Sequence, residues 1–546
     1  MSCGVAGDSP VLAEGLSRAH GALPREGAFP RGNEIQSESA TRRRFLRGAA
    51  LLGAGVTLAR APSLAAQAPA LPGGPIAGLD ALALSEAIRS RAMSCTEVMK
   101  AYLAQIETHN PRVNAIVSLR SASELLAEAK TCDAELARGQ WRGWMHGMPY
   151  AAKDLVGVRG LRTSSGTPLT QGTVATSDSV FIGRIRAAGA LFIGKTNVPE
   201  FGYGSQSYNP VFGVTRNAWD ATRTSGGSSG GASVALALRM VPVADGSDMM
   251  GSLRNPAGWN NVIGFRPTLG TVPGDGPDYI DLLSTAGPMA RNVPDAARLL
   301  STMAGQDPRD PLSLDIDPAR FAAPLETALR GLRIGWLGDY GGYLPMEEGV
   351  LPLCRKALAS VEALGCTVSD ASPGFDMSRL WQAWLVLRHW GAAAWARPLY
   401  QNPKTRAQLK PELVWEVEGG LGLTGEQVSE AMATRAKWYA AISALFERFD
   451  VLALPTAQVF PFDAATHWPQ EVAGRAMDSY HRWMEVVIGG TMSGCPIVAV
   501  PAGFSVTGSP MGLQLIGPIR RDIELLRAGH VFSRAAGFLE RIPPGL

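Results

Sequence analysis

Two segments of this sequence combine serines with many glycines, and their hydroxyl groups are candidates for nucleophilic chemistry. Residues 224–233 read Thr-Ser-Gly-Gly-Ser-Ser-Gly-Gly-Ala-Ser and precede an apolar run at 234–240. Glycines in this number permit unusual backbone shapes and leave peptide N–H groups open. A flexible linker does not suit a segment with apolar elements on both sides, and a Walker-type phosphate loop needs a lysine that is absent here. The remaining interpretation is a structured loop that presents hydroxyls.

The second segment, residues 248–256, reads Asp-Met-Met-Gly-Ser-Leu-Arg-Asn-Pro and follows an apolar run at 241–244. Ser252 therefore stands 24 residues after Ser228 (252 − 228). A serine on a tight turn after a strand exposes its hydroxyl beside free backbone N–H groups. These are the parts of a nucleophile and an oxyanion hole.

A lysine, Lys153, ends the apolar run 149–152 in a chain that otherwise prefers arginine. Burial lowers the pKa of a lysine enough to make its amine a base, which arginine cannot become. The alternative is a solvated lysine at a strand end, paired with Asp154.

Together these segments resemble the amidase signature family. The likeness covers nearly the whole chain after residue 69 and is weakest between about 308 and 450. The motifs are Gly-x-Pro-x-x-x-Lys-Asp at 147–154, Gly-Lys-Thr-Asn-x-Pro-Glu at 194–200, Gly-Gly-Ser-Ser-Gly-Gly at 226–231, Gly-Ser-Leu-Arg-Asn-Pro-Ala at 251–257, Gly-Phe-Arg-Pro-Thr at 264–268, Gly-Cys-Pro at 494–496, Val-Pro-Ala-Gly-Phe at 500–504 and Gly-Leu-Gln-Leu-Ile-Gly-Pro at 512–518.

The resemblance implies an amide hydrolase in which Ser252 is the acylating nucleophile. It makes Ser228 the bridging serine, following a cis peptide after Gly227, and Lys153 the base at the end of the relay. The remaining implied residues are Met249, Met250, Gly251 and Ser252 as oxyanion-hole donors, Gly202 beside the substrate, and Asp248, Arg254 and Ser229 in support. No cofactor or metal is implied, and none of the seven histidines stands in a motif for a Ser-His-Asp triad.

Two positions depart from the family pattern. The residue before Gly251 is often glycine in the family and is Met250 here, so we expect a methionine side chain at the floor of the acyl pocket. Ser225 stands where proline is common. Neither change removes a catalytic group, because every residue other than proline keeps a backbone N–H donor.

The elements that must position these residues alternate between helix and strand. Ser94 and Glu97 form a capping-box pattern for a helix that we expect Asn110-Pro111 to end, and a second helix is expected over 121–138. Short apolar runs bounded by Gly or Pro predict buried strands at 115–119, 149–152, 190–193, 241–244, 497–500 and 512–516. Such alternation predicts one large α/β domain at 69–546, with a central mixed sheet covered by helices on both faces.

The middle segment, about 308–461, is more helical and rich in tryptophan. One interpretation is a helical cap that lines an apolar or aromatic substrate pocket; the other is indoles that only pack helices against the sheet. Its tryptophans are Trp381, Trp384, Trp390, Trp395, Trp415 and Trp438.

Residues 1–68 predict an N-terminal extension with an export leader. Thr-Arg-Arg-Arg-Phe-Leu-Arg at 41–47 resembles the twin-arginine motif, and an apolar stretch at 48–58 is too short to span a membrane. Small-residue cleavage sites follow at 63–65 and 66–68. We expect a periplasmic or secreted protein that meets the twin-arginine export machinery, with a homodimer as one open possibility.

The net charge and the cysteine spacing limit which partners and ligands the sequence predicts. The net charge of +3 is small and no Lys/Arg stripe with aromatics is present, so nucleic acid is not expected as a partner. The six cysteines show no zinc spacing, and whether Cys354 and Cys366 pair is open.

Three functions remain under consideration. The first is a hydrolase of a small-molecule amide, with a bulky or aromatic substrate favoured by the tryptophans and the two methionines. The second is the catalytic component of an aminoacyl-tRNA amidotransferase, which shares these motifs but works in the cytoplasm with partner subunits. The third is an exported binding protein or pseudoenzyme that has lost turnover.

Overall fold

A computed structural model describes residues 75–546 except 277, 278, 280 and 329. The expected leader and its cleavage sites lie outside the described residues. Within the described part, no helix is long and apolar enough to cross a membrane.

An eight-stranded mixed sheet forms the centre of the fold, with the order β10-β9-β11-β15-β14-β7-β8-β6. The neighbours among β10, β9 and β11 run parallel, and the remaining pairs are antiparallel. The strands are β6 (Val243–Asp248), β7 (Ile263–Arg266), β8 (Thr285–Ala290), β9 (Arg333–Trp336), β10 (Thr367–Asp370), β11 (Val451–Pro455), β14 (Ile497–Phe504) and β15 (Pro510–Ile516).

A second sheet has the order β1-β3-β2 and contains β1 (Ile116–Val117), β2 (Pro149–Lys153) and β3 (Leu191–Thr196). One buried carboxylate ties it to the large sheet: Asp245 of β6 accepts hydrogen bonds from the Tyr150 hydroxyl (2.8 Å) and from the Lys153 backbone N–H (3.2 Å to each oxygen). Strands β2 and β6 are thereby fixed beside each other. Two small hairpin sheets pair β4 (Tyr208–Asn209) with β5 (Gly213–Val214) and β12 (Glu471–Val472) with β13 (Arg475–Ala476).

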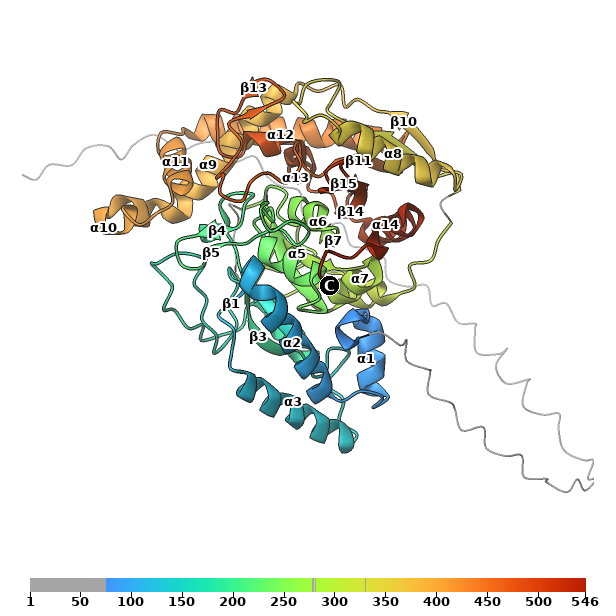
Figure 1. Ribbon diagram of the computed structural model, residues 1–546. Coiled ribbons are helices and arrows are strands. Elements are labelled where there is room, and N and C mark those ends of the chain that lie inside the picture. Colours follow the sequence, from blue (N-terminus) through green and yellow to red (C-terminus); the bar gives the residue numbers. More distant parts are fainter. Residues whose placement is uncertain (1–74, 277–278, 280, 329) are drawn as a thin grey trace, which may run out of the picture. The chain divides into compact units, whose positions relative to one another are not determined.

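The helices of the described part are spread along the whole chain (Figure 1). They are α1 (Ala81–Arg89), α2 (Cys95–Val113), α3 (Ala122–Ala137), α4 (Val180–Ala187), α5 (Gly230–Ala237), α6 (Asn255–Asn260), α7 (Val293–Met303), α8 (Val350–Glu362), α9 (Met377–Gln401), α10 (Pro403–Arg406), α11 (Pro411–Leu421), α12 (Gly425–Leu445), α13 (Ile488–Ser493) and α14 (Asp522–Ala536).

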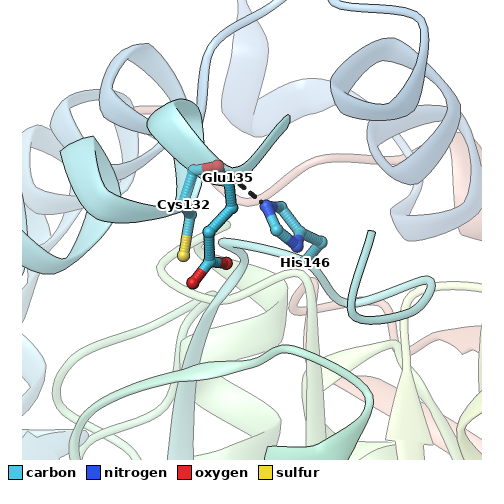
Figure 2. A group of neighbouring side chains, drawn as sticks. All are labelled: Cys132, Glu135 and His146. Atoms are coloured by element: carbon cyan, nitrogen blue, oxygen red, sulfur yellow. Dashed lines mark hydrogen bonds between the residues drawn. The ribbon is translucent and has the colours of Figure 1, made fainter. Parts of the chain in front are cut away.

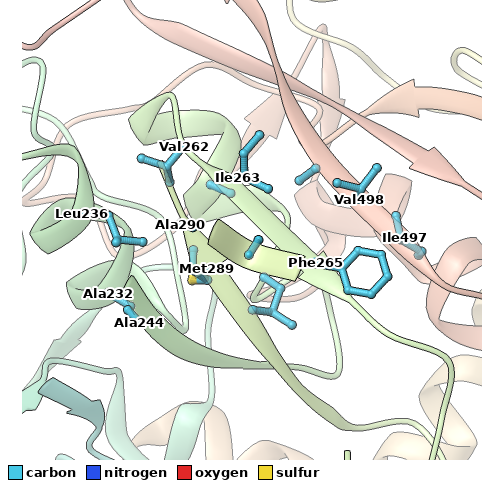
Figure 3. Close-up of a cluster of buried hydrophobic side chains, with 14 of the residues drawn as sticks. Ala232, Leu236, Ala244, Val262, Ile263, Phe265, Met289, Ala290, Ile497 and Val498 are labelled. Carbon is cyan, nitrogen blue, oxygen red and sulfur yellow. The ribbon is translucent and has the colours of Figure 1, made fainter. Parts of the chain in front are cut away.

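Helices cover both faces of the large sheet. Neighbouring residues of a strand point to opposite faces, and on β14 a Cβ added at Gly490 of α13 would lie 2.4 Å from Ile497 Cδ1, whereas one at Gly529 of α14 would lie 2.9 Å from Val498 Cγ1. Figure 3 shows these two side chains among the apolar residues of β7, β8 and α5 that form the core. The expected layered α/β domain is confirmed.

Most of the expected elements are present, with shifted boundaries. The capping box of Ser94 and Glu97 opens α2, but α2 does not stop at Asn110-Pro111. It continues to Val113, because a proline in the last turn costs a single hydrogen bond, and the helix ends at Asn114 in a left-handed conformation (φ 53°). The strand expected over 241–244 is β6, which starts at Val243 and extends to Asp248.

The middle segment, 308–461, differs from a purely helical cap. It supplies three strands of the large sheet (β9, β10 and β11), and its long helices are confined to 377–445. Trp381, Trp384 and Trp438 are completely buried, whereas Trp395 and Trp415 are partly exposed. Packing therefore accounts for the first three.

Candidate active site

Lys153 is the last residue of β2, and its side chain is completely buried. Its Nζ atom donates hydrogen bonds to Ser228 Oγ (2.8 Å), Ser229 Oγ (2.8 Å) and Ser247 Oγ (2.9 Å). The ammonium group is thus surrounded by hydroxyls, with no carboxylate in hydrogen-bonding contact among the described residues.

The alternative pairing of Lys153 with Asp154 does not occur. Asp154 accepts hydrogen bonds from the Ser164 hydroxyl and from its backbone N–H (3.2 Å). Burial lowers the pKa of Lys153 to about 7, although Asp245 and Asp248 act in the opposite direction. A buried lysine with this pKa is a competent base near neutral pH.

The glycine-rich segment is a structured loop that leads into α5. The peptide between Gly227 and Ser228 is cis, as the family resemblance implied. Asn255, at the start of α6, accepts a hydrogen bond from the Gly227 N–H (3.3 Å) and fixes the loop. Ser229 is the residue before α5, so the hydroxyls of Ser228 and Ser229 lie at the N-terminal, positive end of this helix.

The turn that carries Ser252 is built around the buried carboxylate of Asp248. That carboxylate accepts hydrogen bonds from the backbone N–H groups of Gly251 (2.9 Å) and Leu253 (3.1 Å). Arg254 donates to it through Nε (2.9 Å) and Nη2 (2.8 Å), and Arg266 approaches it at 3.3 Å. Burial alone would raise the pKa of Asp248, but the two guanidinium groups outweigh burial and hold it well below its usual range.

This network changes the expectation for one oxyanion donor. The N–H of Gly251 donates to Asp248 in this structure, so it is occupied. Gly251 has φ +82°, and a Cβ there would lie 2.9 Å from Val487 Cγ2, so the turn requires glycine. The remaining candidate donors are the N–H groups of Met249, Met250 and Ser252.

The two serine segments meet at Gly246 of β6. A Cβ added at Gly246 would lie 2.7 Å from Ser229 Oγ and 2.6 Å from Leu253 Cδ2, so the residues that follow Ser228 and Ser252 flank the same glycine. Ser228 is 3% exposed and Ser252 is 7% exposed. Lys153, Ser228 and the turn of Ser252 are therefore gathered at one place on the edge strands.

Gly202, expected beside the substrate, lies next to Ser228. Its φ is +78°, and a Cβ there would lie 3.0 Å from Leu155 Cδ1 and 3.8 Å from Ser228 Oγ. A side chain at position 202 would therefore lie next to the Ser228 hydroxyl.

Met249 and Met250 have different surroundings. Met250, expected at the floor of the acyl pocket, is 5% exposed and belongs to the main apolar core. Met249 is partly exposed, and its sulfur lies 2.9 Å from Nη1 of Arg388 in α9. Helix α9 therefore contacts the turn that carries Ser252 through Met249.

Arg388 belongs to a buried polar cluster above the turn. Its guanidinium pairs with Glu416 of α11, donates to the Tyr480 hydroxyl (2.7 Å) and stacks over the ring of Tyr203 (4.8 Å). The nearby His481 is neutral at pH 7, since burial lowers its pKa to about 3. Glu416 thus compensates the charge of Arg388 within the cluster.

Three residues of the site were not singled out from the sequence: Ser247, Asp245 and Arg266. Ser247 directly precedes Asp248 in β6, but only the packing of β2 against β6 brings its hydroxyl to Lys153. Arg266 stands in the Gly-Phe-Arg-Pro-Thr motif, which marked the position without its contact to Asp248.

Comparisons with known proteins identify the family of this chain. The family model described as Amidase matches residues 97–526. An acylamidase of Rhodococcus erythropolis is 32% identical over 473 residues, covering 85% of this chain and 97% of the relative. The A component of the glutamyl-tRNA(Gln) amidotransferase of Picosynechococcus is 31% identical over 485 residues, covering 84% of this chain and 98% of the relative. A solved bacterial aryl acylamidase has a TM-score of 0.79 at 28% identity, covering 87% of this chain and 100% of that chain. The chain therefore belongs to the amidase signature family and is an enzyme that hydrolyses amide C–N bonds.

Proposed function

We propose that catalysis proceeds through an acyl-enzyme on Ser252, with Ser228 and Lys153 as the proton relay. The observation that carries the proposal is the 2.8 Å hydrogen bond between the buried Lys153 Nζ and Ser228 Oγ. A serine hydroxyl is a weak nucleophile until a base takes its proton. Because burial lowers the pKa of Lys153 to about 7, a large share of this amine is neutral at physiological pH.

In acylation, Ser252 Oγ attacks the amide carbonyl carbon and forms a C–O bond. Its proton moves to Ser228 Oγ as the Ser228 proton moves to Lys153 Nζ. When the tetrahedral intermediate collapses, the C–N bond breaks and the proton returns through Ser228 to the leaving nitrogen. Water then attacks the ester by the same route, and the products are a carboxylic acid and ammonia or an amine.

Backbone N–H groups of the catalytic turn bind the negative oxygen of the tetrahedral intermediate. Met249, Met250 and Ser252 supply the donors, and Asp248 and Arg254 hold the shape of the turn. Loss of one such donor typically costs about 3 kcal/mol of transition-state stabilisation.

For the substrate we propose a bulky or aromatic amide. Met249 contacts Arg388, which stacks over the ring of Tyr203, and Tyr203 accepts a hydrogen bond from the Trp395 indole (3.2 Å). Because Glu416 already compensates Arg388, this region offers aromatic faces rather than a free cation for a carboxylate. The name of the Rhodococcus relative, an acylamidase, is compatible with this substrate class.

The mechanism is tested by hydrolysis of 4-nitroacetanilide with the wild type beside Ser252→Ala, Ser228→Ala and Lys153→Met. Each variant should lose at least about 10³-fold in kcat/KM, since the three residues act as one unit. Ser372→Ala, an exposed serine, is the control and should keep full activity. Full activity in Ser252→Ala would place the nucleophile elsewhere.

The substrate class is tested separately, by comparing acetanilide with acetamide. The wild type should prefer the anilide, and Met249→Ala should change the KM for the anilide more than the KM for acetamide. A clear preference for acetamide would contradict the aromatic pocket without affecting the relay.

The likeness to the Picosynechococcus protein raises the amidotransferase as a second function. Copurification with a tRNA-binding partner would favour it, whereas anilide hydrolysis by the isolated chain favours the hydrolase. A binding protein without turnover is distinguished by a fluorophosphonate probe, which should label Ser252 only in a working enzyme.

We also propose that the protein is exported by the twin-arginine route and works in the periplasm or outside the cell. The support is the sequence at 41–47 and the apolar stretch after it. Replacing Arg42 and Arg43 by lysine should retain the full-length chain in the bacterial cytoplasm. An uncleaved wild-type chain found only in the cytoplasm would contradict export.

We also keep a homodimer as a proposal. Light scattering of the purified chain would measure its mass in solution directly.

A further inference from the structure

Two cysteines outside the candidate active site lie close to each other. Cys95 is the first residue of α2, Cys132 lies in α3, and both side chains are completely buried. A Cβ added at Gly147 would lie 2.6 Å from Cys95 Cβ and 3.5 Å from Cys132 Cβ, so the two cysteine β-carbons are at most about 6 Å apart. The Cys95 thiol donates to the His146 carbonyl (3.8 Å), and it lies close enough to Cys132 for each thiol to shift the pKa of the other. Disulfides join β-carbons about 3.5–4.5 Å apart, so only a small movement separates this pair from a bond.

The backbone around the pair is held by the residue next to Cys132. Asp133 accepts hydrogen bonds from the Cys95 N–H (2.6 Å) and from the N–H (3.1 Å) and hydroxyl (2.6 Å) of Thr96. This carboxylate caps the start of α2 from α3. The approach of the two cysteines is therefore enforced by hydrogen bonds that do not involve sulfur.

The two thiols differ in acidity. The adjacent Cys95 thiol lowers the pKa of Cys132, helped by the positive charge of Arg142, while the Cys132 thiol and burial raise the pKa of Cys95. The thiolate is the species that attacks a disulfide. This difference in pKa favours Cys132 as the attacking sulfur of the pair and Cys95 as the resolving one.

A metal site is the other chemistry that this cluster suggests. Figure 2 shows Cys132 with Glu135 and His146, whose ligand atoms lie within 4.8 Å of one another. However, both oxygens of Glu135 bind Arg142 (2.7 and 2.5 Å). His146 donates from Nε2 to the Cys132 carbonyl (3.0 Å) and accepts from the Arg142 N–H at Nδ1 (3.2 Å). The carboxylate and the imidazole are therefore engaged with protein partners, which argues against a metal ion at this cluster.

We propose that Cys95 and Cys132 form a disulfide that joins α2 to α3 when the protein meets a disulfide oxidant. The Cys132 thiolate attacks one sulfur of the oxidant and releases one reduced thiol; Cys95 then attacks the Cys132 sulfur and releases the second. Two protons and two electrons leave the pair, and the oxidant's disulfide becomes two thiols. Because both sulfurs are buried, the exchange takes place during folding or when α3 opens locally.

The other cysteines provide internal controls. Cys354 of α8 donates to the Gly512 carbonyl (3.8 Å), and burial raises its pKa; Cys495 lies beside Ser493, and burial raises its pKa to about 11. We assign the cross-link to Cys95 and Cys132, and the pairing of Cys354 with Cys366 stays a separate question that the same experiment answers.

The test uses the purified full chain, whose six cysteines include Cys3. The reduced protein is incubated with oxidised glutathione, either folded or during refolding from denaturant, and free thiols are then alkylated under denaturing conditions. Mass spectrometry should find a peptide pair linked through Cys95 and Cys132 and the other four cysteines alkylated. The oxidised protein should unfold at a higher temperature than the reduced protein.

Matched variants decide the assignment. Cys95→Ser and Cys132→Ser should each give no linked peptide and no change of unfolding temperature with oxidation, whereas Cys354→Ser should behave like the wild type. Six alkylated cysteines after both oxidation routes would overturn the proposal, as would a cross-link between other positions. Release of stoichiometric zinc on thiol titration would also overturn it, in favour of a metal site. These measurements require neither enzymatic activity nor export, so a negative result would count against the disulfide and not against the proposed function.

Discussion

Nζ of Lys153, at the end of β2, and Oγ of Ser228, in the loop before α5, lie 2.8 Å apart. The carboxylate of Asp245 makes this contact possible, because it binds the backbone of Lys153 and holds β2 beside β6. A buried amine among hydroxyls loses hydration without gaining a paired carboxylate, which is why its pKa falls.

The first prediction concerns pH. Since the neutral amine is the base and burial lowers the pKa of Lys153 to about 7, kcat/KM should rise with pH through an apparent pKa near 7. Below this value most of the lysine is protonated, and the rate should fall about tenfold per pH unit. A pH–rate profile on a neutral anilide measures this. A rising limb near pH 10 would mean that Lys153 behaves as a solvated lysine.

The second prediction concerns Ser247, whose hydroxyl accepts a hydrogen bond from Lys153 Nζ (2.9 Å). Such a bond stabilises the ammonium form, so Ser247→Ala should lower the pKa of Lys153 further. The rising limb should move to lower pH by about one unit, because hydrogen bonds to charged groups contribute about 1.5–3 kcal/mol. The same pH profile with Ser372→Ala should remain unshifted. A limb that moves to higher pH would contradict this assignment.

The third prediction concerns the ion pair under the catalytic turn. Asp248→Asn leaves the buried guanidinium of Arg254 without its counter-charge, and it should lower the free energy of unfolding by about 3–5 kcal/mol. Asp450→Asn, which breaks the exposed pair with Arg333, should cost less than about 1 kcal/mol. Chemical denaturation of both variants gives the comparison, and equal costs would contradict it.

The ion pair of Asp248 and Arg254 also determines how the free energy of unfolding changes at acid pH. The pKa of Asp248 is depressed in the folded state, so its contribution to stability is present above the unfolded pKa of about 4 and is lost only as pH falls through the lower folded value. The stability difference between wild type and Asp248→Asn should therefore be constant from pH 7 to about 5 and should shrink below pH 4.

The fourth prediction concerns Gly202. Gly202→Ala places a methyl group 3.8 Å from Ser228 Oγ and 3.0 Å from Leu155 Cδ1, at a φ of +78°. Gly341→Ala has a similar φ of +73° but open space around its Cβ, so it reports the backbone strain alone. Both should lose about 1 kcal/mol of stability, and only Gly202→Ala should also lose activity, by at least about tenfold. Equal activities would mean that Gly202 does not face the reacting groups.

The local chemistry of the site could be predicted from the sequence. The motifs around Lys153, Ser228 and Ser252 follow from short stretches of chain, and the resemblance supplied their roles. The capping box at Ser94 and the short apolar runs also predicted elements, because caps and strand burial depend on neighbouring residues.

Other features depend on residues that are distant in the chain. The middle segment was expected to be helical, but β9, β10 and β11 lie within it, since partners elsewhere in the sheet determine whether a short apolar run becomes a strand. The end of α2 was placed too early at Pro111, because one lost hydrogen bond in a last turn is small beside the packing of the helix.

The sequence by itself determined the catalytic residue types, their order and the family, since these are carried by motifs of a few residues. Only the tertiary structure decided that Ser247 contacts Lys153, that Met249 rather than Met250 contacts α9, and that Cys95 lies beside Cys132. The reason is physical: contacts between segments 37 to 139 positions apart depend on how whole elements pack, and local spacing does not encode that packing.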